Sequence, residues 1–285
     1  MIRARGVSQC HNRETLHFEG QKKTFEMEIV SVVALAYATC SDFHTTNYKL
    51  KMDRSAPRIQ KMFAEIAPRY DFLNHFLSCG IDRRWRRRVV KTLAPGKDAK
   101  ILDICTGTGD LALEFHKRYG VQVTAADFCE EMLEIARRKA AKRGVEQHVT
   151  FQHEDAMRLS FPDDCFQYVT VAFGLRNIED TRRGLAEMAR VCAPGGKVAV
   201  LEFSTPTVFP VRQFYQFYFR HILPRVGQLV AKNRQDAYHY LPASVGEFPQ
   251  GTALTRMMEE AGLRETFFRP MTFGIATLYV GTKKL

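Results

Sequence analysis

The sequence of 285 residues lacks paired cysteines. Its seven cysteines are scattered along the chain, and no two stand in a CxxC pair. Structural zinc sites and disulfide frameworks depend on closely spaced cysteines, so this pattern argues against both and favours a reducing compartment. We therefore expect a cytoplasmic protein without a metal site.

Long apolar runs are also missing. A membrane-spanning helix needs about 20 consecutive apolar residues, and the longest run here, Ile29–Cys40, is interrupted by Ser31 and Thr39. The long segment before this run contains several glutamates, which is atypical of a signal or transit peptide. We therefore expect no spanning helix.

Residues 1–51 lack the periodicity of the remaining chain. They carry mixed charge and no clear helix caps, so we interpret them as a poorly ordered N-terminal extension. A translation start at Met52 or a short presequence would each explain this segment. Residues 52–285 have the length of one α/β domain, and the hydrophobic content of 45% suffices for a core.

Basic residues outnumber acidic residues, giving a net charge of +11. Such an excess favours an anionic partner, which includes nucleic acid, acidic lipid and an anionic substrate. The densest basic run surrounds Trp85, and it consists of Arg83, Arg84, Arg86, Arg87, Arg88 and Lys91. A solvated helix face and a membrane-surface contact explain this run equally well. No aromatic-interleaved RNA motif occurs elsewhere, so we do not expect nucleic acid as the partner.

The most informative stretch is Lys100–Ala112, with the sequence KILDICTGTGDLA. A short apolar run indicates a buried strand, and Gly107 and Gly109 follow it directly. A helix-compatible run, Asp110–Tyr119, comes next. Glycines permit a tight turn and close backbone approach to a ligand, and the start of a helix offers free N–H groups. This arrangement is typical of a nucleotide-binding turn.

Two acidic residues restrict the kind of ligand that this turn can bind. Asp103 stands near the end of the first strand, where it suits an ammonium group better than a pyrophosphate. Asp127 ends the next apolar run, at the spacing expected of an acid that binds ribose hydroxyls. S-adenosylmethionine carries both a ribose and a cationic amino-acid end. The alternative is an ordinary turn in which Asp110 caps the helix.

From Lys100 onward, predicted strands and helices alternate. This alternation predicts a doubly wound, mostly parallel sheet with helices on both faces. Strands are expected over 100–104, 121–126, 148–152, 166–172, 197–203, about 264–269 and about 273–281; helices over 110–119, 129–142, 180–191 and about 253–262. Ligands of such sheets bind at the carboxyl ends of the strands. The candidates at those ends are Asp103, Asp127, Asp155, Ala172–Asn177 and Glu202.

Two helical regions flank this pattern. In the first, apolar residues recur at helical spacing from Ile59 to Ile66, and Pro68 should end or kink the helix. The second, Phe209–Val230, is rich in aromatic residues. It is either plain core or one wall of an apolar substrate pocket.

Residues 52–285 resemble the C-methyltransferases of menaquinone and ubiquinone biosynthesis. Four segments carry the resemblance: Tyr70–Trp85, Leu102–Leu111, Phe173–Asn177 and Arg190–Ser204. It implies a class I S-adenosylmethionine-dependent fold, in which a Rossmann-like, mostly parallel seven-stranded sheet follows an N-terminal helical lid. It also implies methylation of a ring carbon of a prenylated quinol. Demethylmenaquinol is the preferred substrate, because Tyr238, Tyr240 and Ser244 look most like the menaquinone branch.

The resemblance also implies site residues. Cofactor contacts are expected at Asp103, Gly107, Thr108, Gly109, Asp127, Asp155, Ala156 and Ala172. Ala172 stands where the family often has a serine, so this contact departs from the family pattern. Tyr70, Arg176 and Asn177 are expected at the substrate. The prenyl tail of the substrate implies that the enzyme acts at a membrane surface, on its inner face. The chain could form a homodimer or remain a monomer.

The predicted chemistry follows from these side chains. Phenolic hydroxyls ionise near pH 10, so the site must favour the anion that activates the ring carbon. Arg176 stays protonated and can stabilise this anion or hold a water that takes the proton, while Asn177 and Tyr70 can orient the ring oxygens. Each of these roles has a purely structural alternative. Arg176 could form an ion pair with Glu179 or Asp180 in an ordinary loop, and Tyr70 could be a residue of the hydrophobic core.

Other functions remain as alternatives. They are ubiquinone-pathway C-methylation of 2-polyprenyl-6-methoxy-1,4-benzoquinol, methylation of another small molecule or of RNA, and a non-catalytic scaffold. The Asn/Asp-Pro-Pro-Tyr motif of amino-group methyltransferases is absent, and Phe173–Asn177 occupies its place. This counts against methylation of nucleic-acid amino groups.

Overall fold

The computed structural model describes residues 53–218, 221 and 235–285. Its central element is a seven-stranded sheet with the order β3-β2-β1-β4-β5-β7-β6. Five strands are parallel, and β7 runs antiparallel to both of its neighbours. The strands are β1 (Lys100–Ile104), β2 (Gln122–Asp127), β3 (Val149–His153), β4 (Phe166–Ala172), β5 (Cys192–Phe203), β6 (Leu263–Met271) and β7 (Ala276–Lys283). The predicted mostly parallel fold is confirmed.

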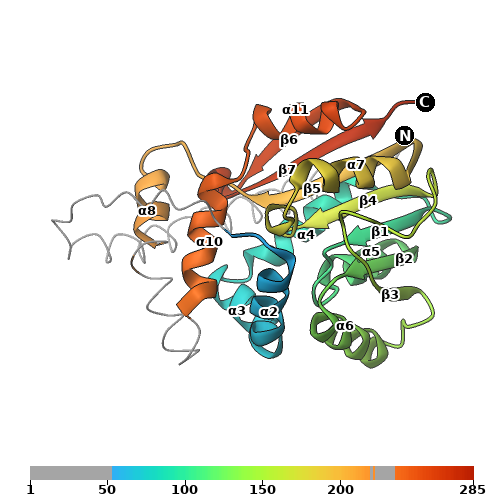
Figure 1. Ribbon diagram of the computed structural model, residues 1–285, viewed down its shortest axis with the longest axis horizontal. Coiled ribbons are helices and arrows are strands. Elements are labelled where there is room, and N and C mark those ends of the chain that lie inside the picture. Colours follow the sequence, from blue (N-terminus) through green and yellow to red (C-terminus); the bar gives the residue numbers. More distant parts are fainter. Residues whose placement is uncertain (1–52, 219–220, 222–234) are drawn as a thin grey trace, which may run out of the picture. The chain divides into compact units, whose positions relative to one another are not determined.

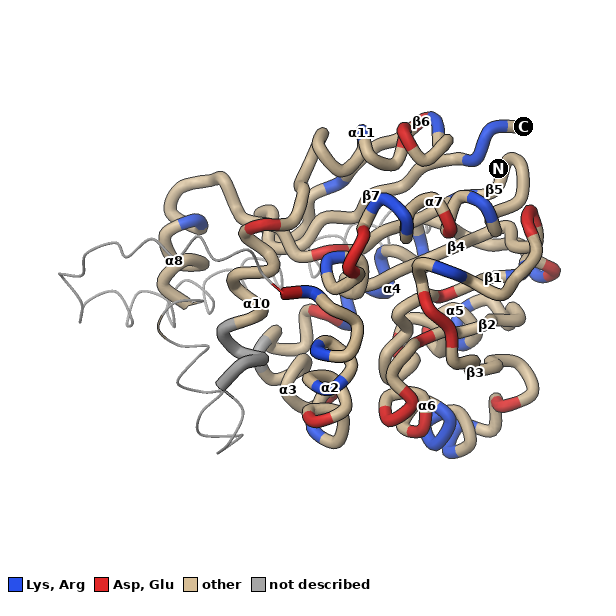
Figure 2. Tube along the Cα trace, in the orientation of Figure 1, with Lys and Arg blue, Asp and Glu red and all other residues tan. Residues whose placement is uncertain are grey.

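Helices cover both faces of the sheet (Figure 1). One core joins the strands to α4 (Ile81–Leu93) and α5 (Asp110–Tyr119), and the other joins them to α7 (Thr181–Val191) and α11 (Thr252–Glu260). The remaining helices are α2 (Ala56–Ile66), α3 (Tyr70–Leu77), α6 (Glu130–Arg143), α8 (Val211–Phe217) and α10 (Gln235–Glu247), with short 3₁₀ turns η1 (Ala67–Arg69), η2 (Leu175–Asn177) and η4 (Thr272–Gly274). In α6 two acidic residues lie in the first turn and two basic residues in the last, which suits the helix dipole (Figure 2).

The predicted helices and strands are present, with boundaries shifted by a few residues. The largest difference is β5, which begins at Cys192 rather than near residue 197. Gly195 and Gly196 do not mark the end of the preceding helix, which ends at Val191. They lie inside β5, where the register against β4 shifts between Phe166 and Tyr168. Gly144 does end α6, with the left-handed backbone expected of a C-terminal glycine.

Helices α2, α3 and α10 lie beyond the carboxyl ends of the parallel strands (Figure 1). Helix α2 ends at Ile66, and Pro68 falls in the 3₁₀ turn that follows, as expected. A proline cannot donate the backbone hydrogen bond that would continue the helix. The chain therefore turns into α3, and this brings Tyr70 over the sheet edge.

The basic run forms helix α4, but its members do not share one environment. Trp85 is buried and packs against the rings of Phe173 and Phe203, and its indole N–H donates to the Thr272 hydroxyl at 2.8 Å. Arg86 is buried too. A surface role for these two residues is therefore wrong. The exposed members are Arg83, Arg84, Arg87, Arg88 and Lys91.

Parts of two predictions fall outside the described residues. These are the N-terminal extension, 1–51, and the segment of Phe209–Val230 that contains Phe219, Pro224 and Gly227. Among the helices of the described ranges, none combines the length and apolar character that crossing a bilayer requires.

Candidate active site

The turn between β1 and α5 is shaped by its two glycines. Gly107 and Gly109 have φ values of +56° and +80°, in the left-handed region that other residues avoid. A Cβ on Gly109 would also lie 2.9 Å from the Phe151 ring. Gly109 immediately precedes Asp110, so helix α5 begins directly after the turn, at the carboxyl ends of the parallel strands.

A cavity opens beside this turn. Its lining includes polar groups from the ends of three strands and apolar side chains opposite them. The predicted cofactor residues in the lining are Gly107, Asp127, Asp155, Ala156 and Ala172. Carboxylates suit ribose hydroxyls and an ammonium group, and the apolar wall suits an adenine ring. The carboxylates and the apolar wall of this cavity therefore fit S-adenosylmethionine.

Asp127 is the most firmly placed of these residues. One of its carboxylate oxygens accepts the backbone N–H of Gly107 at 2.7 Å, and the other accepts that of Cys129 at 2.9 Å. Burial raises the pKa of Asp127, and these hydrogen bonds oppose the rise. A carboxylate has about four lone-pair sites, so two remain for ligand hydroxyls.

Asp103 lies behind the cavity and does not line it. Its carboxylate is buried and accepts the Thr106 hydroxyl at 2.6 Å and the Thr170 hydroxyl at 2.7 Å. Burial raises its pKa to about 6, despite these two hydrogen bonds. Its contact with the cofactor ammonium remains a prediction, and the structure gives its oxygens other partners.

Thr108 also faces away from the cavity. Its buried hydroxyl donates to Asp71 of α3 at 2.5 Å and accepts from the amine of Lys139 at 3.1 Å. Lys139 in turn donates to Asp71 at 2.8 Å and to Asp110. These polar contacts join α3, the glycine turn and α6. The cofactor contacts of Thr108 and Gly109 remain predictions, because neither residue lines the cavity.

A second cavity adjoins the first. Both are lined by Phe63, Tyr70 and Phe173. The second adds Arg176, Tyr240 and the ion pair of Asp82 with Arg86 among apolar neighbours. The expected substrate residues are thus divided: Asn177 lines the first cavity, Arg176 the second, and Tyr70 both. Burial raises the pKa of Tyr70, although a hydrogen bond with Asn74 opposes this. Tyr70 therefore stays neutral and can act as a hydrogen-bond donor at the boundary.

The loop that carries these residues is held in an unusual conformation. Phe173 has φ +62°, and its carbonyl oxygen accepts the Asn177 amide at 3.3 Å and the Arg176 guanidinium. A Cβ on Gly174 would come within 2.3 Å of the Cys105 Cβ. Only glycine lets this loop lie so close to the cofactor turn. Strained backbone of this kind is frequent at functional sites.

Arg176 does not pair with Glu179 or Asp180, so that alternative is wrong. Its partner is Glu202 at the end of β5, with Nη1 3.0 Å from the carboxylate. Asn177 is held separately, because its side-chain oxygen accepts the Tyr240 hydroxyl at 3.1 Å. Both residues are buried.

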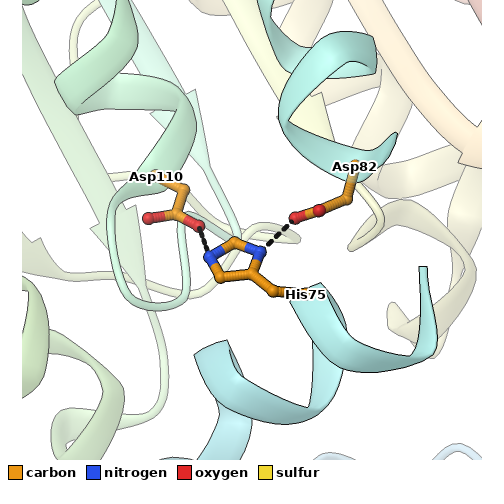
Figure 3. Close-up of side chains that lie close together, drawn as sticks. All are labelled: His75, Asp82 and Asp110. Atoms are coloured by element: carbon orange, nitrogen blue, oxygen red, sulfur yellow. Dashed lines mark hydrogen bonds and ion pairs between the residues drawn. The ribbon is translucent and has the colours of Figure 1, made fainter. Parts of the chain in front are cut away.

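His75 lies between two carboxylates (Figure 3). Its Nδ1 is 2.8 Å from a carboxylate oxygen of Asp82, and its Nε2 is 3.9 Å from one of Asp110. One possible ligand atom from each of the three residues lies within 4.8 Å of the other two. Such a group has the composition of a metal site. However, Asp82 already pairs with Arg86 at 2.6 Å, and Asp110 pairs with Lys139. Two fixed cations would repel a metal ion, so we interpret the group as an ion-pair network that joins α3, α4 and α5.

Sequence reasoning missed several members of the site. Asp71 and Lys139 fix the glycine turn, Cys105 lines the cofactor cavity, and Tyr240 holds Asn177. Asp71 and Cys105 lie inside segments that carry the family resemblance, and Tyr240 is one of the residues typical of the menaquinone branch, so the resemblance was the one available signal. Lys139 offered none, because it looks like any exposed residue of a charged helix.

Comparison with known proteins agrees with this geometry. Residues 50–283 match the model of the ubiE/COQ5 methyltransferase family. The chain belongs to this family. It is 44% identical over 248 residues to the ubiquinone/menaquinone biosynthesis C-methyltransferase UbiE of Geobacter sulfurreducens, which covers 86% of this chain and 95% of that protein. It is 48% identical over 223 residues to the demethylmenaquinone methyltransferase of Thermus thermophilus, covering 78% and 100%.

Solved structures support the fold of this ubiE/COQ5 family member. A methyltransferase from Thermotoga maritima aligns with a TM-score of 0.55 at 21% identity, covering 79% of this chain and 99% of that chain. A chain in the complex between the Haloferax volcanii Trm112 methyltransferase activator and its methyltransferase aligns with a TM-score of 0.58 at 14% identity, covering 78% and 98%. The predicted class I methyltransferase fold is confirmed, and S-adenosylmethionine is the co-substrate of this enzyme family.

Proposed function

We propose that this protein transfers a methyl group from S-adenosylmethionine to a ring carbon of demethylmenaquinol. The observation that supports this most directly is the pair of adjoining cavities that share Phe63, Tyr70 and Phe173. The cavity at the glycine turn offers carboxylates, and the other offers apolar walls with two buried arginines, Arg176 paired with Glu202 and Arg86 paired with Asp82. This division suits a polar nucleoside beside an aromatic ring.

The residues of the second cavity would activate the ring. A quinol hydroxyl must lose its proton before the neighbouring carbon becomes nucleophilic, and water can accept this proton. Arg176 cannot act as an ordinary base, since it stays protonated. Its guanidinium can donate hydrogen bonds to the ring oxygen as negative charge develops there.

Tyr70 and Asn177 would position the ring. Tyr70 lines both cavities, so its hydroxyl can reach a ring oxygen while its ring covers the cofactor turn. Asn177 has one amide N–H remaining after its bond to the Phe173 carbonyl. When bound, S-adenosylmethionine would supply an electrophilic methyl group with a neutral thioether as leaving group. Alignment and exclusion of water would then provide much of the rate.

The quinol head group decides between two pathway branches. The relatives' names include both menaquinone and ubiquinone biosynthesis. Purified protein should be incubated with methyl-labelled S-adenosylmethionine and either a short-chain demethylmenaquinol or a short-chain methoxybenzoquinol. We expect faster labelling of the naphthoquinol. Faster labelling of the benzoquinol would assign the ubiquinone branch, and labelling of neither would reject the proposal.

We also propose that the enzyme meets its substrate at an anionic membrane surface. The prenyl tail of the substrate resides in the bilayer, and α4 presents five exposed basic residues. On the neighbouring helix α3, Phe72 and Phe76 are exposed and stacked, with ring centroids 5.7 Å apart. Basic groups beside exposed aromatic rings are typical of peripheral membrane contacts.

A further inference from the structure

Glu202 is a buried acid at the carboxyl end of β5. Its side chain is 1% exposed, and both oxygens are used within the loop that follows β4. One oxygen accepts the backbone N–H of Arg176 at 3.1 Å, and the other accepts Nη1 of the same residue at 3.0 Å. The second oxygen also accepts the backbone N–H of Phe203 at 3.1 Å. Glu202 thus fixes both the main chain and the side chain of Arg176.

The guanidinium of Arg176 is held on further sides. Nη1 also donates to the carbonyl oxygen of Phe173, and the guanidinium carbon lies 5.4 Å from the centroid of the Phe203 ring. Arg176 is only 6% exposed. A buried ion pair costs desolvation and is a poor source of stability, so its presence calls for another reason.

Both side-chain hydrogen bonds of this guanidinium come from Nη1, so they leave the N–H groups on Nε and Nη2 unused. Among the described residues, Nε of Arg176 has no hydrogen-bond partner, although it is buried. Buried donors are almost always satisfied in native proteins, and an unsatisfied one destabilises the fold. Arg176 lines the second cavity, where the proposed function places the quinol ring. The guanidinium therefore has N–H groups that are available to a ligand oxygen in this cavity.

We propose that Glu202 is a positioning residue that holds Arg176 through Nη1, so that the other N–H groups of the guanidinium remain available to the ionised ring oxygen. This inference rests on the proposed function. The pairing also leaves the site with no net charge before the ring oxygen ionises, so neutral quinol can enter. Lysine could not replace Arg176, because an ammonium group has no rigid planar fork that binds Glu202 with one nitrogen and a ligand with another.

The test combines Glu202→Gln with Arg176→Lys. Glutamine keeps the shape and one acceptor but removes the charge that holds the guanidinium. We expect Glu202→Gln to lower kcat about 10- to 100-fold, as is typical when a supporting partner of a site residue is removed. Calorimetry should show unchanged S-adenosylmethionine affinity, because Glu202 does not line the cofactor cavity. The double variant should be no slower than Arg176→Lys alone, since Glu202 acts through Arg176.

A matched control separates positioning from stability. Glu187 pairs with Arg190 at 2.8 Å and lines neither cavity. Glu187→Gln should lower the unfolding temperature without changing kcat. Should Glu202→Gln fold poorly, Glu202→Asp keeps the charge while shortening the side chain, and the same loss of kcat at unchanged cofactor affinity is expected. The inference would be overturned if the losses of kcat in the two single variants multiplied in the double variant. It would also be overturned if Glu202→Gln, or a folded Glu202→Asp, kept kcat within twofold of the parent.

A readout without turnover distinguishes failure of this inference from failure of the proposed function. Neutral and ionised 1-naphthol absorb differently, so absorbance reports the pH at which the bound naphthol loses its proton. We expect Glu202→Asp, which keeps the charge of the pair but displaces the guanidinium, to raise this pH, while Glu187→Gln leaves it unchanged. This result would support the positioning role even in a protein that methylates no quinol. An unchanged ionisation in a folded Glu202→Asp would overturn it.

Discussion

The hydroxyl of Thr108 in the glycine turn donates to the carboxylate of Asp71 in α3 across 2.5 Å. Lys139 of α6 donates to the same carboxylate at 2.8 Å. The helix that carries Tyr70 is thereby fixed to the turn that shapes the cofactor cavity. Binding of the cofactor and the placement of Tyr70 should therefore be coupled.

Asp71→Asn tests this coupling. The variant keeps an acceptor for Thr108 but loses the charge that pairs with Lys139, a partly exposed interaction worth about 0.2–1 kcal/mol. We expect faster amide hydrogen exchange in α3 and a raised KM for the quinol, with the sheet unaffected. Asp164→Asn, which removes a comparable partly exposed pair with Lys283, should leave the exchange of α3 unchanged. Equal exchange in the two variants would contradict the coupling.

Asp127→Ala should weaken binding of S-adenosylmethionine. The change removes charged hydrogen bonds to the ribose, worth about 1.5–3 kcal/mol. It also frees the N–H of Gly107, so the turn itself should loosen. Asp127→Asn retains one acceptor and should fall between the parent and the alanine variant in calorimetry. Parental affinity in Asp127→Ala would remove this residue from the cofactor site.

Asp103 should make stability depend on pH. Its pKa is about 6 in the folded protein and 3.8 in the free side chain. Between these values the folded state retains a proton that the unfolded state has lost, so this group's contribution to stability falls as pH rises and is constant above about pH 7. Asp103→Asn cannot ionise. It should therefore be more stable than the parent at about pH 7, by on the order of 1–3 kcal/mol.

Urea unfolding at several pH values measures this difference. The gap between Asp103→Asn and the parent should widen from about pH 5 to about pH 7 and then stay level. Asp98→Asn, at an exposed position, should show no such trend. A gap that is independent of pH would mean that Asp103 does not carry the buried charge.

Replacing Arg84, Arg87 and Arg88 with alanine should reduce binding to anionic liposomes. Each basic residue near such a surface contributes about 1 kcal/mol, and salt screens this attraction. Activity on a detergent-solubilised quinol should survive, because these exposed residues line neither the cofactor cavity nor the second cavity. Replacing Arg182 in α7, Arg256 in α11 and Arg264 in β6 removes the same charge elsewhere and should leave binding unchanged. Liposome binding is measured by cosedimentation. An equal loss of binding in the two triple variants would contradict a docking role for α4.

The sequence predicted what depends on local pattern. Alternating strands and helices gave the sheet, and the glycine turn with Asp127 gave the cofactor cavity, because these features are encoded within short segments. Contacts between distant segments could not be predicted in this way. Thr108 and Asp71 are 37 residues apart, and Asn177 and Tyr240 are 63 apart. Local pattern can also mislead. Trp85 belongs to the core, but the basic residues around it in the sequence suggested a surface position.

The most direct test of the account is the site of methylation. Purified protein, S-adenosylmethionine with a deuterated methyl group and a short-chain demethylmenaquinol should yield a product whose deuterated methyl group is on a ring carbon, identified by nuclear magnetic resonance and mass spectrometry. Arg176→Ala should abolish this product while retaining cofactor affinity. A deuterated methyl group on oxygen, or full ring methylation by Arg176→Ala, would contradict the account.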